Sequence, residues 1–156
     1  MLEAVEITRA NLRDYLDLAL APGQEKLVAP NAVTVAQAHY EPGTWVRGLA
    51  AGGTPVGMMA MIDVSALGEP AEPGDPENWA YLWRLMIDAK HQRTGYGTEA
   101  IAIAFAQARV WRRPTLALHV EVDGPNARAF YERLGFVATG RIDRNERFMT
   151  APVPSC

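Results

Sequence analysis

Hydrophobic and polar side chains alternate along residues 81–88, and this period of two predicts a β-strand. A glycine-rich segment follows, Gln92-Arg93-Thr94-Gly95-Tyr96-Gly97-Thr98. Beyond it the apolar residues recur with helical spacing, at Ile101, Ala104, Phe105 and Ala108. The sequence therefore predicts a strand, a tight glycine loop and a helix, and this unit organises the chain.

The segments before this unit predict a strand, two helices and a β-hairpin. They are a strand around residues 5–7, a helix over residues 12–20, a short helix capped by Asn31, and strands at 45–51 and 56–64. The two later strands flank a Gly-Gly-Thr-Pro turn at 52–55, which is a hairpin signal.

Residues 65–78 predict an exposed loop between two strands. The segment contains three prolines and two glycines, and its four acids (Glu69, Glu72, Asp75 and Glu77) have no Lys or Arg within the segment. Loops of this length often carry function, and an acidic border would attract a cationic substrate. The alternative is a solvated acidic surface that lies away from any site.

The remaining chain predicts alternating strands and one helix. The strands cover residues 116–122, 136–140 and 147–150, with a polar turn around 143–145 before the last of them. Apolar residues at 127, 130, 131 and 134 form one helix stripe, which Gly135 ends. We expect residues 1–156 to form a single α/β domain.

Composition is that of an ordinary globular protein, with 49% hydrophobic and 21% charged residues and a net charge of −3. The acidic balance argues against a general nucleic-acid binder. A lone cysteine, Cys156, allows no intrachain disulfide, and we find no signal-peptide pattern and no apolar run long enough for a bilayer. We therefore expect a cytoplasmic protein without membrane or nucleic-acid partners.

The glycine loop is a candidate phosphate site because backbone N–H groups at a helix N-terminus attract anions. A P-loop is excluded because Thr98-Glu99 stands where Lys-Ser/Thr is needed. A dinucleotide fingerprint fits only in part: Ala100 replaces its third glycine, Glu121 lies near the expected acidic position, and no second βαβ half follows. A plain glycine turn without a ligand is the remaining alternative.

Two motifs together resemble one family, the GNAT N-acetyltransferase superfamily. The segment 92–97 is similar to its acyl-CoA signature Q/R-x-x-G-x-G/A, and Ala127-Arg128-Ala129-Phe130-Tyr131-Glu132-Arg133-Leu134-Gly135-Phe136 is similar to A-x-x-(F/L)-Y-E-x-L-G-F. The resemblance covers most of the chain and implies a central, mixed but mainly antiparallel sheet flanked by helices, with two splayed strands at the cofactor site. Residues 27–31, 36–38 and 82–88, with Trp45, look like the bacterial spermine/spermidine (diamine) acetyltransferases.

The resemblance implies transfer of an acetyl group from acetyl-CoA to a primary amine. Its cofactor residues map onto the strand backbone at Leu85, Met86 and Ile87, with a bulge near Met86, and onto the pyrophosphate loop Gln92, Arg93, Thr94, Gly95, Tyr96, Gly97 and Thr98. The family often has Asn seven residues before the helix tyrosine. Gly124 stands there in this chain, so Asn126 is either the replacement ligand or only a helix cap.

The same resemblance implies that Tyr131 is the general acid, since a phenol is protonated at neutral pH and can donate to the CoA sulfur. For the base, Glu121, Asp88 and His119 remain candidates, beside deprotonation through water. The three histidines have no metal-ligand spacing, so no metal is expected.

The expected partners are acetyl-CoA and a small-molecule amine, with a polyamine such as spermidine or spermine as the leading acceptor and a homodimer left open. A peptide or aminoglycoside amine is the alternative acceptor. A non-catalytic acyl-CoA-binding sensor on the same fold is the rival from another class.

Overall fold

The computed structural model describes residues 1–25, 28–124 and 127–155 of the chain. Asn126, the candidate replacement ligand or helix cap, and Cys156, the lone cysteine, lie outside these residues.

Seven strands form one sheet in the order β1-β2-β3-β4-β5-β7-β6. They are β1 (Leu2–Val5), β2 (Thr44–Ala51), β3 (Thr54–Ile62), β4 (Trp79–Ile87), β5 (Thr115–Glu121), β6 (Val137–Asp143) and β7 (Glu146–Pro152). Every neighbouring pair is antiparallel except β4 and β5, which are parallel. The predicted mixed, mainly antiparallel sheet is confirmed.

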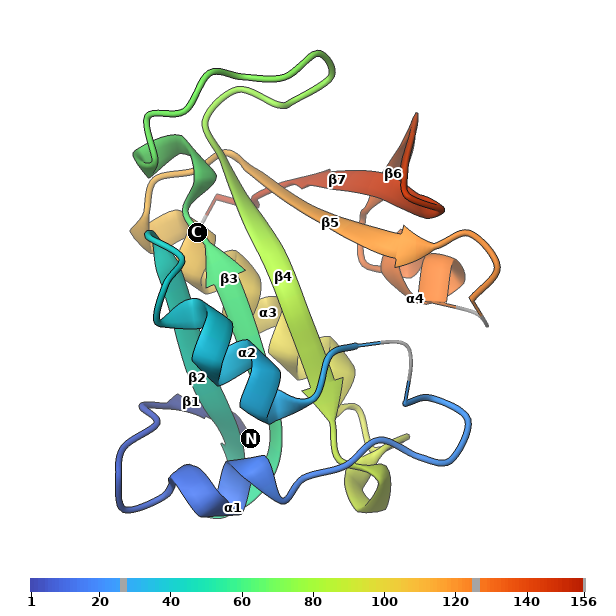
Figure 1. Cartoon of the computed structure of the whole chain (residues 1–156). Coiled ribbons are helices and arrows are strands. Elements are labelled where there is room, and N and C mark those ends of the chain that lie inside the picture. Colours follow the sequence, from blue (N-terminus) through green and yellow to red (C-terminus); the bar gives the residue numbers. More distant parts are fainter. Residues whose placement is uncertain (26–27, 125–126, 156) are drawn as a thin grey trace.

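The helices are α1 (Leu12–Leu16), α2 (Asn31–Ala38), α3 (Tyr96–Val110) and α4 (Ala127–Arg133), with 3₁₀ turns at Val64–Ala66 and Ala89–His91. In Figure 1, α2 lies in front of the sheet and α3 behind it. The buried face of α3, with Ile101, Ala104 and Ala108, packs into the main hydrophobic core, as its helical spacing predicted. Helix α1 ends at Leu16, four residues earlier than the apolar pattern indicated.

Strands β4 and β5 separate soon after they pair. Their parallel pairing covers only Trp79↔Thr115, Ala80↔Leu116 and Tyr81↔Ala117. Beyond those pairs β4 continues to Ile87 and β5 continues to Glu121, and Figure 1 shows the two strands diverging. The splay opens the sheet between two buried strands, and that opening positions the site described below.

A β-bulge in β4 lies earlier than the sequence predicted. The pairing with β3 shifts between Ala60↔Arg84 and Met61↔Leu82, which leaves Trp83 as the extra residue. The expected bulge near Met86 is therefore wrong, since Met86 pairs regularly with Met58. The extra residue also reverses the alternation, so that Leu85 joins Leu82 on the side of the core.

The C-terminal strands form a hairpin with an irregular outer strand. Arg144 and Asn145 in the turn have φ of 49° and 64°, the left-handed values that a tight hairpin turn requires. The β6–β7 pairing shifts between Ala138 and Ile142, where Gly140 has φ of 90°. Beyond this irregularity Arg141 and Asp143, two residues apart, lie on the same face of β6.

Candidate active site

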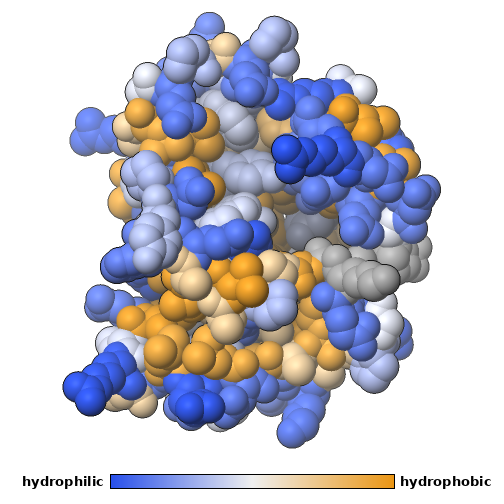
Figure 2. Space-filling view, in the orientation of Figure 1, coloured by the Kyte–Doolittle hydropathy of each residue, from blue (hydrophilic) through white to orange (hydrophobic). Residues whose placement is uncertain are grey.

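Two cavities meet at the splay between β4 and β5. The larger has a volume of about 770 Å³ and the smaller about 340 Å³. Six residues line both: Val28, Leu85, His119, Glu121, Tyr131 and Glu146. In the orientation of Figure 2, the surface is hollowed between a mostly hydrophobic region around α1 and α2 and a hydrophilic region at the opposite end.

The larger cavity gathers most of the residues that the sequence predicted for the cofactor. Its walls include Leu85, Met86, Ile87, Gln92, Arg93, Gly95, Tyr96, Gly97 and Thr98. Thr94 does not line it, and its hydroxyl donates to the carbonyl oxygen of His91 at 2.6 Å. Gly124 lines the same cavity.

The backbone of β4 presents free hydrogen-bonding groups to this cavity. Asp88 N donates to Val56 O at 2.8 Å, so Asp88 and Val56 form a hydrogen-bonded pair of the antiparallel ladder. Because such pairs alternate with non-bonded ones, Met86 also bonds β3, whereas Leu85 and Ile87 direct their N–H and C=O groups into the splay. An extended ligand could therefore add to β4 at Leu85 and Ile87.

The glycine loop has the backbone geometry of an anion site. Arg93 and Gly95 have φ of 60° and 88°, and Gly95 is the N-cap of α3. The amides of Tyr96, Gly97 and Thr98 occupy the first turn of α3, where a helix provides no internal acceptor. Positive backbone dipoles thus converge at the loop end of the larger cavity.

Gly97 is small for a packing reason. A Cβ at this position would lie 3.3 Å from Cζ of Phe130 in α4. The glycine thus lets α3 approach the helix that carries Tyr131. The torsional requirement falls on Gly95 instead.

The Gln92 side chain contacts protein groups. Its Nε2 donates to Ile87 O at 3.0 Å and to Gln24 Oε1 at 2.9 Å. Gln92 thereby joins the end of β4 to the segment between α1 and α2, and it uses one of the backbone acceptors that face the splay. Leu20 and Gln24 of that segment line the larger cavity too, which the sequence did not predict.

Tyr131 lies where the two cavities join. Its ring packs edge-on against Phe130 and Phe136, with centroids 5.0 and 5.6 Å away. Burial raises the pKa of the Tyr131 phenol to about 12. Within the three described ranges, no hydrogen bond engages its hydroxyl, so the phenol is protonated and free to donate to a ligand.

The three candidate bases have different positions. Glu121 and His119 line both cavities, and the His119 ring bonds Tyr81 and Asp143. Asp88 lines neither cavity, and its Oδ1 accepts the backbone N–H of Ala19 at 2.9 Å. Asp88 is therefore a structural residue that connects β4 to the end of the α1 region.

The smaller cavity contains charged residues that the sequence analysis did not identify. Glu146 pairs directly across the strands with Glu121, an arrangement of like charges that is unfavourable unless a cation lies nearby. Arg84 adds one positive charge and donates to Thr34 and Gln37 of α2. No local pattern could reveal these residues, because they meet only when β4, β5 and β7 adjoin.

The acidic loop after β3 has a different role from the one predicted. Arg141 of β6 donates to Asp75 at 2.8 Å and to Glu72 at 3.4 Å, so a distant residue balances two of the loop acids. The described part of the chain contributes no residue of this loop to either cavity. The loop therefore does not border the site.

A splayed parallel strand pair, a glycine loop at a helix N-terminus and a half-buried tyrosine between two cavities form a cleft of the kind that an acyl-CoA-dependent acyltransferase needs. The family model described as "Acetyltransferase (GNAT) family" matches residues 9–136. The chain belongs to this family, and it is an N-acetyltransferase with acetyl-CoA as its cosubstrate. A comparison with curated protein sequences gave no match.

Solved structures with the same fold are distant in sequence. PaiA N-acetyltransferase from Thermoplasma acidophilum, in complex with coenzyme A, is 13% identical with a TM-score of 0.68 over 97% of this chain and 99% of that one. A spermidine N-acetyltransferase SpeG chimera from Vibrio cholerae and hSSAT is 17% identical (TM-score 0.71; 97% and 94% covered). The ribosomal-protein-S18-alanine N-acetyltransferase from Escherichia coli is 16% identical (TM-score 0.67; 100% and 96% covered).

Among residues 1–25, 28–124 and 127–155, no group of three or more His, Cys, Asp and Glu side chains is arranged to hold a metal ion. In the same ranges, every helix is too short or too polar to cross a bilayer.

Proposed function

We propose that the chain transfers acetyl directly from acetyl-CoA in the larger cavity to a primary amine in the smaller one. The observation that carries this proposal is the junction of the two cavities at Tyr131. A donor and an acceptor that enter from opposite sides would meet there, and alignment of two reactants is a main source of catalysis in group transfer.

The cofactor residues in this proposal are largely backbone groups. The N–H and C=O groups of Leu85 and the N–H group of Ile87 would pair with the pantetheine arm, as in strand addition, while Gln92 already donates to the Ile87 carbonyl. The amides of residues 93–98 would hold the pyrophosphate. Met86, Gln92 and Arg93 would add side-chain contacts from the cavity wall.

Tyr131 is the proposed general acid. Its raised pKa keeps the phenol protonated at neutral pH, and its hydroxyl can give a proton to the departing thiolate sulfur. Family membership and this unengaged hydroxyl favour an enzyme over the non-catalytic acyl-CoA sensor.

The proposed acceptor is a polyamine such as spermidine. Glu121 and Glu146 outnumber Arg84 in the smaller cavity, so the walls favour a cationic ligand. A solved structure with the same fold is a spermidine N-acetyltransferase chimera by name. The volume of about 340 Å³ suits a small amine better than a long peptide, although the fold also serves an alanine N-acetyltransferase of a ribosomal protein.

The test is an acceptor screen with acetyl-CoA that follows release of free thiol. It compares spermidine, a monoamine with a neutral body, an aminoglycoside and a lysine peptide, each at low and high salt. We expect the highest kcat/KM with spermidine and a decrease with salt, since screening weakens attraction between exposed charges. Equal values for the monoamine or the peptide at both salt concentrations would reject the polyamine, while thiol release with any amine would still support the transferase.

A further inference from the structure

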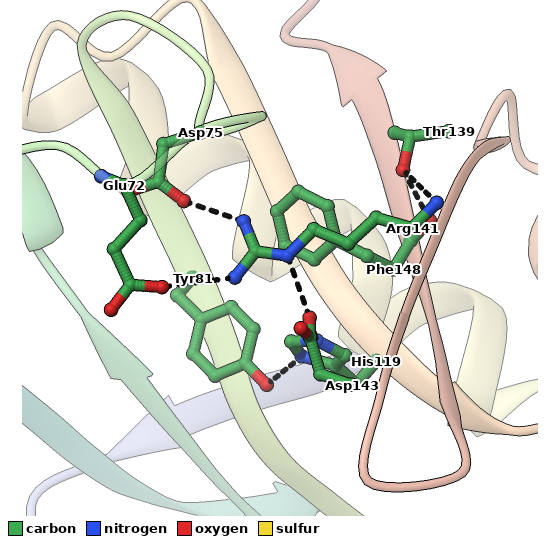
Figure 3. Close-up of polar contacts among 8 residues, drawn as sticks. All are labelled: Glu72, Asp75, Tyr81, His119, Thr139, Arg141, Asp143 and Phe148. Atoms are coloured by element: carbon green, nitrogen blue, oxygen red, sulfur yellow. Dashed lines mark hydrogen bonds and ion pairs between the residues drawn. The ribbon is translucent and has the colours of Figure 1, made fainter.

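A chain of hydrogen bonds leads from the smaller cavity to the surface of the protein. The Tyr81 hydroxyl lies 2.6 Å from Nδ1 of His119, and Nε2 of His119 lies 2.9 Å from Oδ2 of Asp143. Figure 3 shows this Tyr81–His119–Asp143 series, in which three side chains from β4, β5 and β6 point toward one another. Tyr81 and His119 line the cavity, whereas the Asp143 side chain is 39% exposed.

The direction of each hydrogen bond follows from chemistry. The Asp143 carboxylate only accepts, so Nε2 of His119 carries the hydrogen. The remaining ring nitrogen, Nδ1, then has a lone pair and accepts from the Tyr81 hydroxyl. Burial, with the nearby charges of Glu146 and Asp143, raises the pKa of Tyr81 well above its ordinary value, which agrees with a hydroxyl that donates.

Arg141 holds Asp143 in the ionised form that this arrangement needs. The hydrogen bond from His119 and the Arg141 guanidinium keep the pKa of Asp143 below its ordinary value. Arg141 Nε donates to Asp143 Oδ2 at 2.7 Å, and the guanidinium lies 4.9 Å above the Phe148 ring. Asp75 and Glu72 fix the far side of the guanidinium, so the acidic loop acts on the cavity indirectly, through Arg141.

We propose that the Tyr81–His119–Asp143 series takes the proton from the acceptor ammonium, with His119 as the proton acceptor and Tyr81 as the group that contacts the amine. This rests on the proposed function, and it selects His119 from the candidate bases. Tyr131, the proposed acid, lines the same cavity, so a proton acceptor and a proton donor stand beside one amine.

The proton balance closes without another reactant. The Tyr81 oxygen receives a proton from R–NH₃⁺ as its own hydrogen passes to Nδ1 of His119, and the imidazolium pairs with Asp143 until the proton leaves to water. Tyr131 gives its proton to the thiolate and recovers one from the nitrogen after the C–N bond forms and the C–S bond breaks. The products are the acetamide, the free thiol and one released proton.

Other charged groups face this series from every neighbouring element. They are Arg84 of β4, Glu121 of β5, Glu146 of β7, Arg141 of β6, Tyr131 of α4, and Glu72 and Asp75 of the loop. Asp143 and Arg141 act through His119 and are positioning residues.

The experiment measures kcat/KM against pH, with the best acceptor of the screen, for the wild type and for His119→Gln and Tyr81→Phe. The wild-type enzyme can use the ammonium form while His119 is unprotonated, so its kcat/KM is nearly flat from neutral pH up to the pKa of the amine. In both variants only the free amine reacts. Their kcat/KM falls about 100-fold at neutral pH, as expected for a lost proton acceptor, and recovers tenfold per pH unit toward the pKa of the amine.

A matched acceptor pair adds a second measurement. Ethylamine is protonated at neutral pH, whereas trifluoroethylamine of similar size is largely neutral. His119→Gln should reduce the rate much more for ethylamine, because trifluoroethylamine does not need the base. Asp143→Asn should also lower kcat/KM at neutral pH, with recovery toward the pKa of the amine, but by a smaller factor than His119→Gln.

Arg113→Lys is the control, since it weakens a structural ion pair with Asp63 that lies outside both cavities. It should leave the profile unchanged. Two results would overturn the proposal and leave the transferase assignment intact. One is that His119→Gln reduces the rate equally for ethylamine and trifluoroethylamine. The other is that His119→Gln and Tyr81→Phe both lower kcat/KM without changing the shape of its pH profile. If the wild type acetylates no amine, the proposed function itself fails. If His119→Gln does not fold, Tyr81→Phe provides the test, because it removes only the hydroxyl and keeps the ring packing.

Discussion

The two cavities of this enzyme are built from different parts of the polypeptide. Residues 85–98 contribute more of the wall of the larger one than any other segment, and this stretch presents the backbone groups of Leu85 and the amides that begin α3. The smaller one is bounded by residues from five separate segments, among them Tyr81 and Arg84, and it shares His119, Tyr131 and Glu146 with the larger cavity. Backbone binding tolerates sequence change, whereas side-chain binding does not.

This difference explains why a fold can keep its cosubstrate while its acceptor changes. The solved structures with this fold include a spermidine enzyme and an alanine N-acetyltransferase of a ribosomal protein, at 17% and 16% identity. Four predictions test whether changes in one cavity leave the function of the other unaffected.

The largest effect is expected where the cavities join. Tyr131→Phe deletes only the hydroxyl and keeps the packing against Phe130 and Phe136. The kcat should fall by roughly 100-fold, the low end for general acid catalysis, with little change in the Kd of acetyl-CoA. Steady-state kinetics and calorimetric titration check this, and a wild-type kcat would remove the general-acid assignment.

The next effect belongs to the larger cavity alone. Gly95 has φ of 88°, and a Cβ there would meet nothing within 4 Å, so Gly95→Ala strains only the backbone of the anion loop. The Kd of acetyl-CoA should rise roughly tenfold, about the worth of one hydrogen bond to a charged group. Gly53→Ala is the matched control, because Gly53 has φ of 83°, equally open space and a position in the β2–β3 turn.

Both glycine variants should lose about 1–2 kcal/mol of unfolding free energy, the cost of a left-handed residue with a Cβ. Only Gly95→Ala should weaken cofactor binding. Equal affinity in the two variants would show that the loop does not bind the pyrophosphate.

A smaller effect is expected from the carboxylates of the acceptor cavity. Glu121→Gln and Glu146→Gln should each raise the KM for spermidine by roughly three- to fivefold, since single partly exposed charges contribute about 1 kcal/mol or less. Glu69→Gln in the acidic loop is the control, and its KM should match the wild type. A rise in KM for Glu69→Gln alone would restore the loop as the acceptor border.

The smallest effect concerns stability at alkaline pH. The folded state raises the pKa of Tyr131 from 10.0 to about 12, so it holds the neutral phenol. This contribution is complete below pH 10 and is lost as the pH rises toward 12, because the unfolded chain ionises first. Urea unfolding at several alkaline pH values should therefore show a steeper loss for the wild type than for Tyr131→Phe. Parallel losses would mean that the phenol is not shielded from water.

The sequence predicted well the strand, turn and helix that line the larger cavity, because their signals lie in neighbouring residues. Alternation at 81–88, the Gly95 turn and the stripe of α4 all come from neighbouring residues, and each appears in the structure close to its predicted place. The bulge at Trp83 was misplaced because bulges depend on the register with β3, which one strand alone does not encode.

The sequence did not reveal the charged contacts around the smaller cavity, because they form only between residues far apart in the chain. Glu146 faces Glu121 through strand pairing, and Arg141 reaches Asp75 across 66 positions. In the sequence, the acids of the 65–78 loop therefore indicated a border that attracts a cationic substrate. In the structure, the distant Arg141 pairs with two of these acids. The sequence offers His119 as one of three candidate bases but does not reveal its partners, which lie 38 and 24 positions away.

The short pairing between β4 and β5 has a consequence for folding. Strands β1–β4 pair with neighbours in order, and β5–β7 form a second block, while the strand pairing that joins the two blocks covers three residue pairs. Local antiparallel contacts form quickly, whereas a parallel pairing must first close the loop that separates its strands. We expect the two blocks to gain structure before they dock. Amide hydrogen exchange at residues 79–81 and 115–117 would then report the docking step, separately from the interior of either block.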